Sequence, residues 1–223
     1  MRKVLAAGLG VALMVGVSCD ALAATTDGGT TFTIKISSVS ANDTLKVAGS
    51  AAVKAPIAPG VFLLDSSAAA FEVGKAASAE LQALAEDGNF EPLQLALMDK
   101  FGARAGMFAP GLEFTVTAKP GDRLSFATMF VQSNDKFYAP AGGGLALFDA
   151  NGRPVAGDLT ASVRLFDAGT EIDQQPGAGA DQAPRQKGAN QGADQSGMVA
   201  EANDGFAYPA VSDVIRLEIK AAE

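Results

Sequence analysis

Alternation of apolar and polar residues dominates the chain and predicts β-strands. Residues 32–36 alternate Phe and Ile with Thr and Lys, which is the period-two pattern of a strand with one buried face. Residues 60–65 centre on a short apolar run, which indicates a strand buried on both faces. Further strand patterns cover residues 161–166 and 214–220. The pattern therefore predicts an all-β fold.

A turn sequence lies between two more alternating runs. Residues 112–118 alternate strictly, and Lys119-Pro120-Gly121-Asp122 fits a type II turn, in which Pro presets φ and Gly takes the positive φ. In residues 123–131 one face carries Leu and Phe while the other is small and apolar, as in a central strand. We expect these two runs to form a β-hairpin.

Residues 145–158 predict a second hairpin with a tight turn at Asp149-Ala150-Asn151-Gly152. Its Asp-x-Asn start is similar to an EF-hand loop, but the glycine comes two positions early and no helices flank it. A hairpin turn is the preferred interpretation.

Two short helices are predicted between the strands. Ser78 can cap a helix that runs to Glu86 and ends at Gly88, and residues 92–100 begin with Pro at a favourable first-turn position. Together the elements predict an antiparallel β-sandwich with one or two short helices inserted between strands.

Residues 1–23 have the features of a signal peptide. A basic start precedes an apolar run over residues 5–17, which is too short to span a membrane, and Ala21-Leu22-Ala23 supplies a small-x-small cleavage pattern. We expect an exported protein, periplasmic or extracellular, whose residues 24–223 form a single domain without a transmembrane segment. Lipid anchoring through Cys19 is the minor alternative.

Charge and composition exclude several functions for that domain. Residues 1–23 carry two basic residues and one acidic residue, so 15 basic and 24 acidic residues remain. Such an acidic balance argues against nucleic-acid binding. The chain has no histidine, which rules out His-dependent triads and His-ligated metals. We expect no enzymatic activity.

The chain from 168 to 209 is a long polar region rich in Gly, Ala, Gln, Asp and Asn. Loops of this length within compact domains are functional, pinned by a ligand, or disordered. Its charged residues, including Asp173, could assist metal or partner binding, but a solvated loop is the preferred interpretation. Four phenylalanines could form a partner-binding patch, although core packing is the more common role: Phe71, Phe90, Phe101 and Phe108.

Two predicted strands end in acidic clusters. Asp135 follows residues 122–132 after a short turn, and Asp167 directly follows residues 161–166, with Glu171 nearby. If these ends meet, the carboxylates of Asp135, Asp167 and Glu171 could bind calcium, which prefers oxygen ligands; ordinary solvated loops are the alternative. Carboxylates of Asp135 and Asp167 closer than about 5 Å would require a shared cation, because like charges repel.

Four segments in order resemble the spondin N-terminal domain, most closely its bacterial secreted representatives: Ala-Glu-Asp-Gly (85–88), Pro-Gly-Asp-Arg-Leu-Ser-Phe-Ala-Thr-Met-Phe-Val-Gln-Ser-Asn-Asp (120–135), Phe-Asp-Ala-Gly-Thr-Glu (166–171) and Tyr-Pro-Ala-Val-Ser-Asp-Val-Ile-Arg (208–216). The resemblance implies a C2-like β-sandwich with a calcium site at one end. It places ligands at Asp135 and Asp167. Glu171 stands where animal members have Asp, and Lys136 where they often have Trp.

The resemblance implies a secreted calcium-binding adhesion or recognition module, whose partner is an unidentified cell-surface or matrix protein or glycan. A metal-free, envelope-associated structural β-sandwich is the alternative. A carboxylate-pair glycoside hydrolase, using Asp135 with Glu171 or Asp167 with Asp173, is weaker, because the chain has no Trp and only two Tyr for sugar stacking.

Overall fold

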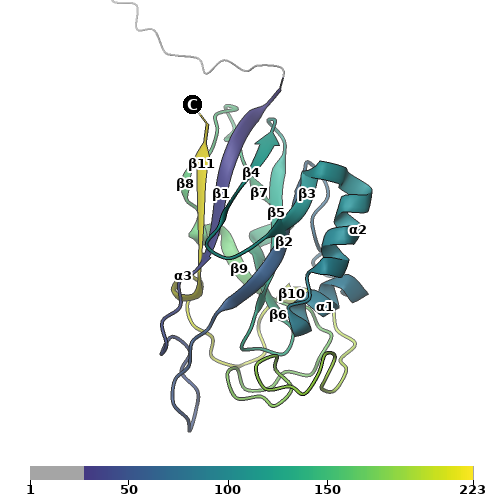
Figure 1. Ribbon diagram of the computed structural model, residues 1–223, viewed down its shortest axis with the longest axis vertical. Helices are drawn as coiled ribbons and strands as arrows, with labels where there is room; N and C mark the ends of the chain where they lie inside the picture. Colours follow the sequence, from purple (N-terminus) through teal and green to yellow (C-terminus); the bar gives the residue numbers. More distant parts are fainter. Residues whose placement is uncertain (1–27, 223) are drawn as a thin grey trace, which may run out of the picture.

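Two antiparallel sheets pack face to face and form a β-sandwich in the computed structural model, which describes residues 28–222 (Figure 1). The architecture confirms the predicted fold class. The predicted signal peptide and Cys19 lie outside the described residues. Across residues 28–222, no helix combines the length and the apolar character that crossing a membrane requires.

The smaller sheet has four strands in the order β4 (Glu113–Ala118), β1 (Thr30–Ser38), β11 (Ile215–Ala221) and β8 (Gly157–Asp158). Strand β1 pairs with both β4 and β11, and the alternating residues of β1 that face inward are fully buried. This matches the period-two pattern of residues 32–36.

The larger sheet has seven strands, and six of them follow one another as β10 (Ala200–Glu201), β9 (Val163–Asp167), β6 (Lys136–Pro140), β5 (Arg123–Phe130), β2 (Ile57–Asp65) and β3 (Ala105–Phe108). Strand β7 (Leu145–Ala146) also pairs with β5. Strands β5 and β6 are buried along almost their whole length, because this sheet is covered on both faces.

Helices α1 (Ala79–Asp87) and α2 (Glu91–Phe101) are inserted between β2 and β3 and lie against the outer face of the larger sheet (Figure 1). The Ser78 hydroxyl accepts the Leu81 N–H, and Gly88 ends α1 in the left-handed conformation, so both predicted caps are confirmed. Shorter helical segments complete the chain: η1 (Gly102–Arg104), η2 (Ala141–Gly143), η3 (Thr160–Ser162) and α3 (Val211–Val214).

Alternate residues of the larger sheet fill two separate cores. In β2, Phe62 and Leu64 face the smaller sheet, whereas Val61 and Leu63 face the helices. Small residues of β5 such as Ala127 line the helix side, which lets α1 pack close to the sheet. The phenylalanines suspected of partner binding are core residues or pack against the core: Phe71, Phe90, Phe101 and Phe108.

The expected hairpin of residues 112–131 is wrong in its pairing. The turn forms, since the Asp122 N–H donates to the Lys119 carbonyl at 2.9 Å and Gly121 has φ of 98°. However, β4 pairs with β1 in one sheet, and β5 pairs with β2 and β6 in the other. Strand β4 has exposed alternate residues and suits a sheet with one solvent face, whereas β5 is buried on both faces. The turn therefore joins the two sheets.

The second predicted hairpin, residues 145–158, is present only as a tight turn, because β7 at its start pairs with β5 of the larger sheet and β8 at its end pairs with β11 of the smaller sheet. The Asp149 N–H donates to the Arg153 carbonyl, and the Val155 N–H donates to the Leu147 carbonyl, both at 2.9 Å. One Asp149 carboxylate oxygen accepts the N–H groups of Asn151 and Arg153. The aspartate therefore stabilises its own turn, which agrees with the hairpin interpretation.

Candidate functional site

Two neighbouring strands bring the predicted acidic residues together. Strands β6 and β9 are antiparallel neighbours, and their register pairs Lys136 with Asp167. The first residue of β6 therefore lies beside the last residue of β9. Asp135 immediately precedes β6, and its carbonyl accepts the Ala168 N–H at 3.1 Å. The predicted convergence of Asp135 and Asp167 is thus present.

Three carboxylates converge at this end of the larger sheet. One oxygen from each of Asp135, Asp167 and Asp173 lies within 4.8 Å of the other two, and such a group could hold a metal ion. Asp173 comes from the polar region 168–209, and only 15% of its side chain is exposed. The expectation of a solvated loop at Asp173 is therefore wrong.

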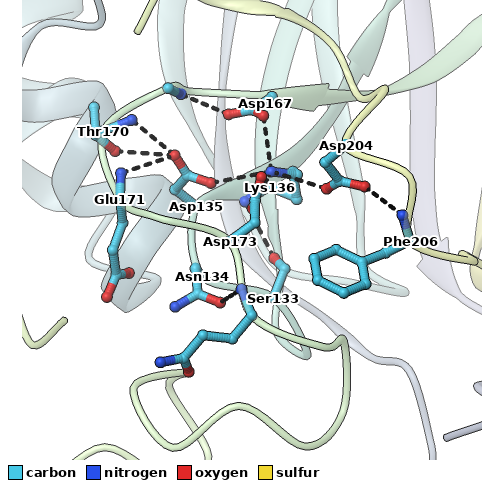
Figure 2. A network of polar contacts seen from close by, with 12 residues as sticks. Ser133, Asn134, Asp135, Lys136, Asp167, Thr170, Glu171, Asp173, Asp204 and Phe206 are labelled. Atoms are coloured by element: carbon cyan, nitrogen blue, oxygen red, sulfur yellow. Dashed lines mark hydrogen bonds and ion pairs between the residues drawn. The ribbon is translucent and has the colours of Figure 1, made fainter. Parts of the chain in front are cut away.

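A cation already lies among these carboxylates, namely the ammonium group of Lys136 (Figure 2). The Lys136 side chain is 0% exposed, and its Nζ lies 2.9 Å from Asp167 Oδ2 and 3.4 Å from Asp135 Oδ1. It also donates to Asp173 Oδ1 and lies 3.4 Å from Asp204 Oδ2. Four carboxylates thus surround one ammonium group.

Backbone groups hold the second oxygen of Asp135. Its Oδ2 accepts the N–H groups of Thr170 at 2.8 Å and Glu171 at 3.2 Å, together with the Thr170 hydroxyl at 3.3 Å. The carboxylate of Asp167 similarly accepts the Gly169 N–H at 2.7 Å, and Gly169 turns the chain with φ of 69°. The segment 167–171 therefore wraps around Asp135, and these contacts fix the direction of both carboxylates.

Burial and charge shift the ionisation of the cluster. Burial alone would lower the pKa of Lys136, but the charge of Asp135 and the hydrogen bonds to Asp173 and Asp167 outweigh it and raise this pKa above its ordinary value. Burial raises the pKa of Asp173 to about 6, although Lys136 opposes this rise. For Asp204, burial would raise the pKa, but hydrogen bonds from Tyr208 and the Phe206 N–H, with the charge of Lys136, lower it.

The carboxylate of Glu171, the third predicted ligand, is not part of the group of three. Figure 2 shows it pointing away from Lys136. Both of its carboxylate oxygens are buried and have no hydrogen-bond partner among the described residues. Burial raises the pKa of Glu171 to about 8, and the nearby charge of Glu86 adds to the rise. Glu171 contributes to the site through its N–H group, which contacts Asp135.

Buried amide side chains connect the polar region 168–209 to the turn that precedes β6. Gln182 is fully buried, and its Nε2 donates to Asn134 Oδ1 at 3.2 Å and to the Gln175 carbonyl at 3.0 Å. Arg185 donates to Gln132 Oε1 at 3.0 Å. Asn134 and Gln132 both belong to the turn that leads into β6. The same turn therefore positions both the acidic cluster and this region.

Lys136 and Asp204 belong to the site although the sequence patterns did not predict them as site residues. The resemblance to the spondin N-terminal domain marks Lys136 only as a position at which animal members often have Trp. A useful signal was available, since Lys136 directly follows an acidic residue and precedes an apolar strand. A lysine at such a position becomes buried when the strand is central, and it then needs carboxylate partners.

Comparison of the chain with models of known protein families gave no match, and comparison with curated proteins gave no significant match.

Proposed function

We propose that the protein is an exported, non-enzymatic recognition module that binds a calcium ion at the acidic end of its β-sandwich. The convergence of the Asp135, Asp167 and Asp173 carboxylates carries this proposal, because their oxygens lie within 4.8 Å of one another. Carboxylate oxygens are among the ligands that calcium prefers. The resemblance to the spondin N-terminal domain supports the same conclusion.

The charge of the cluster favours a cation that carries more positive charge than one ammonium group. Four carboxylates face a single ammonium group, and Asp167 and Asp173 are 17% and 15% exposed. A calcium ion approaching from solvent would meet these two carboxylates first. Uncompensated carboxylates at this separation repel one another, so a divalent ion would relieve more of the repulsion than a monovalent group.

A bound ion would link three parts of the chain. Asp135 precedes β6, Asp167 ends β9, and Asp173 belongs to the region 168–209. An ion held by all three would tie this region to the strand ends and fix the end face of the sandwich. We propose that this face contacts a cell-surface or matrix protein or glycan. The buried, hydrogen-bonded state of Asp135 supports a binding role over a catalytic one.

Calcium should raise the melting temperature, and this is the direct test. At a hundredfold excess over the dissociation constant, binding adds about 2.7 kcal/mol to the free energy of unfolding. Titration calorimetry and melting curves in chelator, millimolar calcium and millimolar magnesium measure the effect. Asp135→Asn, Asp167→Asn and Asp173→Asn should each abolish it, whereas Asp43→Asn, on a side chain that is 75% exposed, should not. Equal melting curves in chelator and calcium would contradict the proposal.

A metal-free structural module is the second candidate, and the position of Lys136 favours it. Its ammonium group already provides the cluster with a cation, through contacts to four carboxylates. In that case the acidic end would be stable without calcium. The same calorimetric titration separates the two candidates.

A further inference from the structure

We propose that Lys136 is the resident cation of the acidic site and that its ammonium group competes with a divalent metal ion for the same carboxylates. This inference rests on the proposed function, because it concerns what controls metal binding at that site. In addition, Lys136 sets the affinity of the site for the metal.

The competition follows from where the ammonium group lies. Nζ contacts Asp135 Oδ1, Asp167 Oδ2 and Asp173 Oδ1, and these three carboxylates are the ones that could hold a metal. A calcium ion needs its ligand oxygens at about 2.3–2.6 Å, whereas Nζ lies 2.9 Å from Asp167 Oδ2. Both cations therefore require the same space between the carboxylates (Figure 2).

Mutual repulsion also prevents simultaneous occupancy. Two positive charges a few ångströms apart inside a protein repel strongly, and the Lys136 side chain is 0% exposed, so water does not screen its charge there. Metal binding therefore requires the ammonium group to move outward. Lysine has a flexible four-carbon stem that permits such a movement, and the displaced group would become accessible to solvent.

The competition predicts that calcium binds the wild-type protein weakly and a charge-free variant more tightly. Lys136→Met removes the ammonium group and keeps a long apolar side chain for the buried stem. Since a hydrogen bond to a charged group corresponds to about tenfold or more in an equilibrium constant, the affinity should rise by at least about tenfold. Lys220→Met is the matched control, because Lys220 forms an exposed ion pair with Glu113 far from the cluster in sequence and should leave the affinity unchanged.

Calorimetric titration of calcium into wild type, Lys136→Met and Lys220→Met tests the inference. Tighter binding by Lys136→Met alone supports it, including the case in which wild type does not bind at all; that case would overturn the proposed function and leave the inference standing. Equal affinities in wild type and Lys136→Met would overturn the inference and leave the calcium function standing. An absence of binding in all three proteins would overturn both.

If Lys136→Met does not fold without metal, a labelling experiment on the wild-type protein tests the competition instead. Acetic anhydride modifies accessible amines, and mass spectrometry of peptides reports each lysine separately. We expect Lys136 to be protected in chelator and modified in calcium, with Lys220 modified equally in both. Protection of Lys136 in the calcium-bound protein would overturn the inference. Recovery of folded Lys136→Met on addition of calcium would support it.

Discussion

Glu171 illustrates how one side chain can work against the stability of the domain. Its carboxyl group is almost fully buried, and neither oxygen has a hydrogen-bond partner among residues 28–222. The nearby acidic groups of Glu86, Asp135 and Asp181 add to the effect of burial and raise its pKa to about 8. An ionised carboxylate in this position is costly, so the folded protein favours the protonated form.

The stability of the metal-free protein should therefore fall with pH because of Glu171. The folded state binds its proton more tightly than the unfolded state, whose pKa is near 4.5, so the stabilisation is complete below 4.5 and lost as pH rises through about 8. Glu171→Gln removes the ionisation. We expect melting in chelator at pH 8–9 to rise by about 2–4 °C or more over wild type, and the gain to shrink toward pH 4–5.

Glu201→Gln is the control for this experiment, because Glu201 is an exposed carboxylate on the edge strand β10. Its melting temperature should follow that of wild type at every pH. A gain for Glu171→Gln that is the same at pH 5 and pH 9 would show that ionisation of Glu171 has no part in the effect.

The sequence predicts part of this site and misses the rest for a physical reason. Asp135 and Asp167 are placed by strand ends, and strand ends can be predicted from alternation. Asp173 and Asp204 lie in irregular chain, where no periodicity indicates which way a side chain points. The role of Lys136 depends on β6 being a central strand, which is a property of sheet order and is absent from the local pattern.

At the scale of elements, helix ends and turns could be predicted from the local sequence, whereas the pairing of strands could not. Ser78 and Gly88 determine the ends of α1 through contacts within a few residues, so their sequence identifies them. The turn at Pro120-Gly121 is equally local, and it forms. Which strands pair across that turn depends on which faces the rest of the chain covers, and the cover of β5 comes from helices inserted some forty residues earlier.

The site requires glycine at position 169, because another segment of the chain approaches its backbone closely. A Cβ at this position would lie 2.8 Å from the Met198 N and 3.0 Å from the Gly197 Cα, and the Gly197 N–H donates to the Gly169 carbonyl at 2.7 Å. Gly169→Ala should therefore separate the two segments and lower the free energy of unfolding by about 2–4 kcal/mol, from backbone strain together with overpacking.

Urea unfolding of Gly169→Ala and Gly205→Ala isolates the contribution of close packing. Gly205 also has a positive φ, of 84°, but a Cβ there would meet no atom within 4 Å. Both variants carry the cost of the left-handed backbone, about 1–2 kcal/mol, and only Gly169→Ala adds the clash. Equal losses in the two variants would show that the approach of Gly197 is unimportant.

The whole molecule combines a rigid sandwich with one long polar region that lies at one end of it (Figure 1). Two apolar cores hold the sheets and helices together. Residues 168–209 contribute few apolar residues to these cores and depend mainly on hydrogen bonds. Regions of this kind open with less free energy than the global unfolding of the domain. Among residues 28–222, the site therefore lies where the polar region, which we expect to open more easily, meets the two apolar cores.

A substitution at Gln182 can measure the difference in stability between the polar region 168–209 and the sandwich. It is fully buried, and its side chain contacts Asn134, the Gln174 and Gln175 carbonyls and the Gly177 N–H. Gln182→Ala removes these hydrogen bonds, each of which contributes about 0.5–1.5 kcal/mol. Hydrogen exchange followed by mass spectrometry should show roughly tenfold or greater acceleration in peptides covering residues 172–195, with little change in β1 and β11.

Gln195→Ala, at an exposed position, should exchange like wild type. Acceleration spread evenly over both sheets would show that the polar region and the sandwich unfold as one unit, and the site would then share the full stability of the cores.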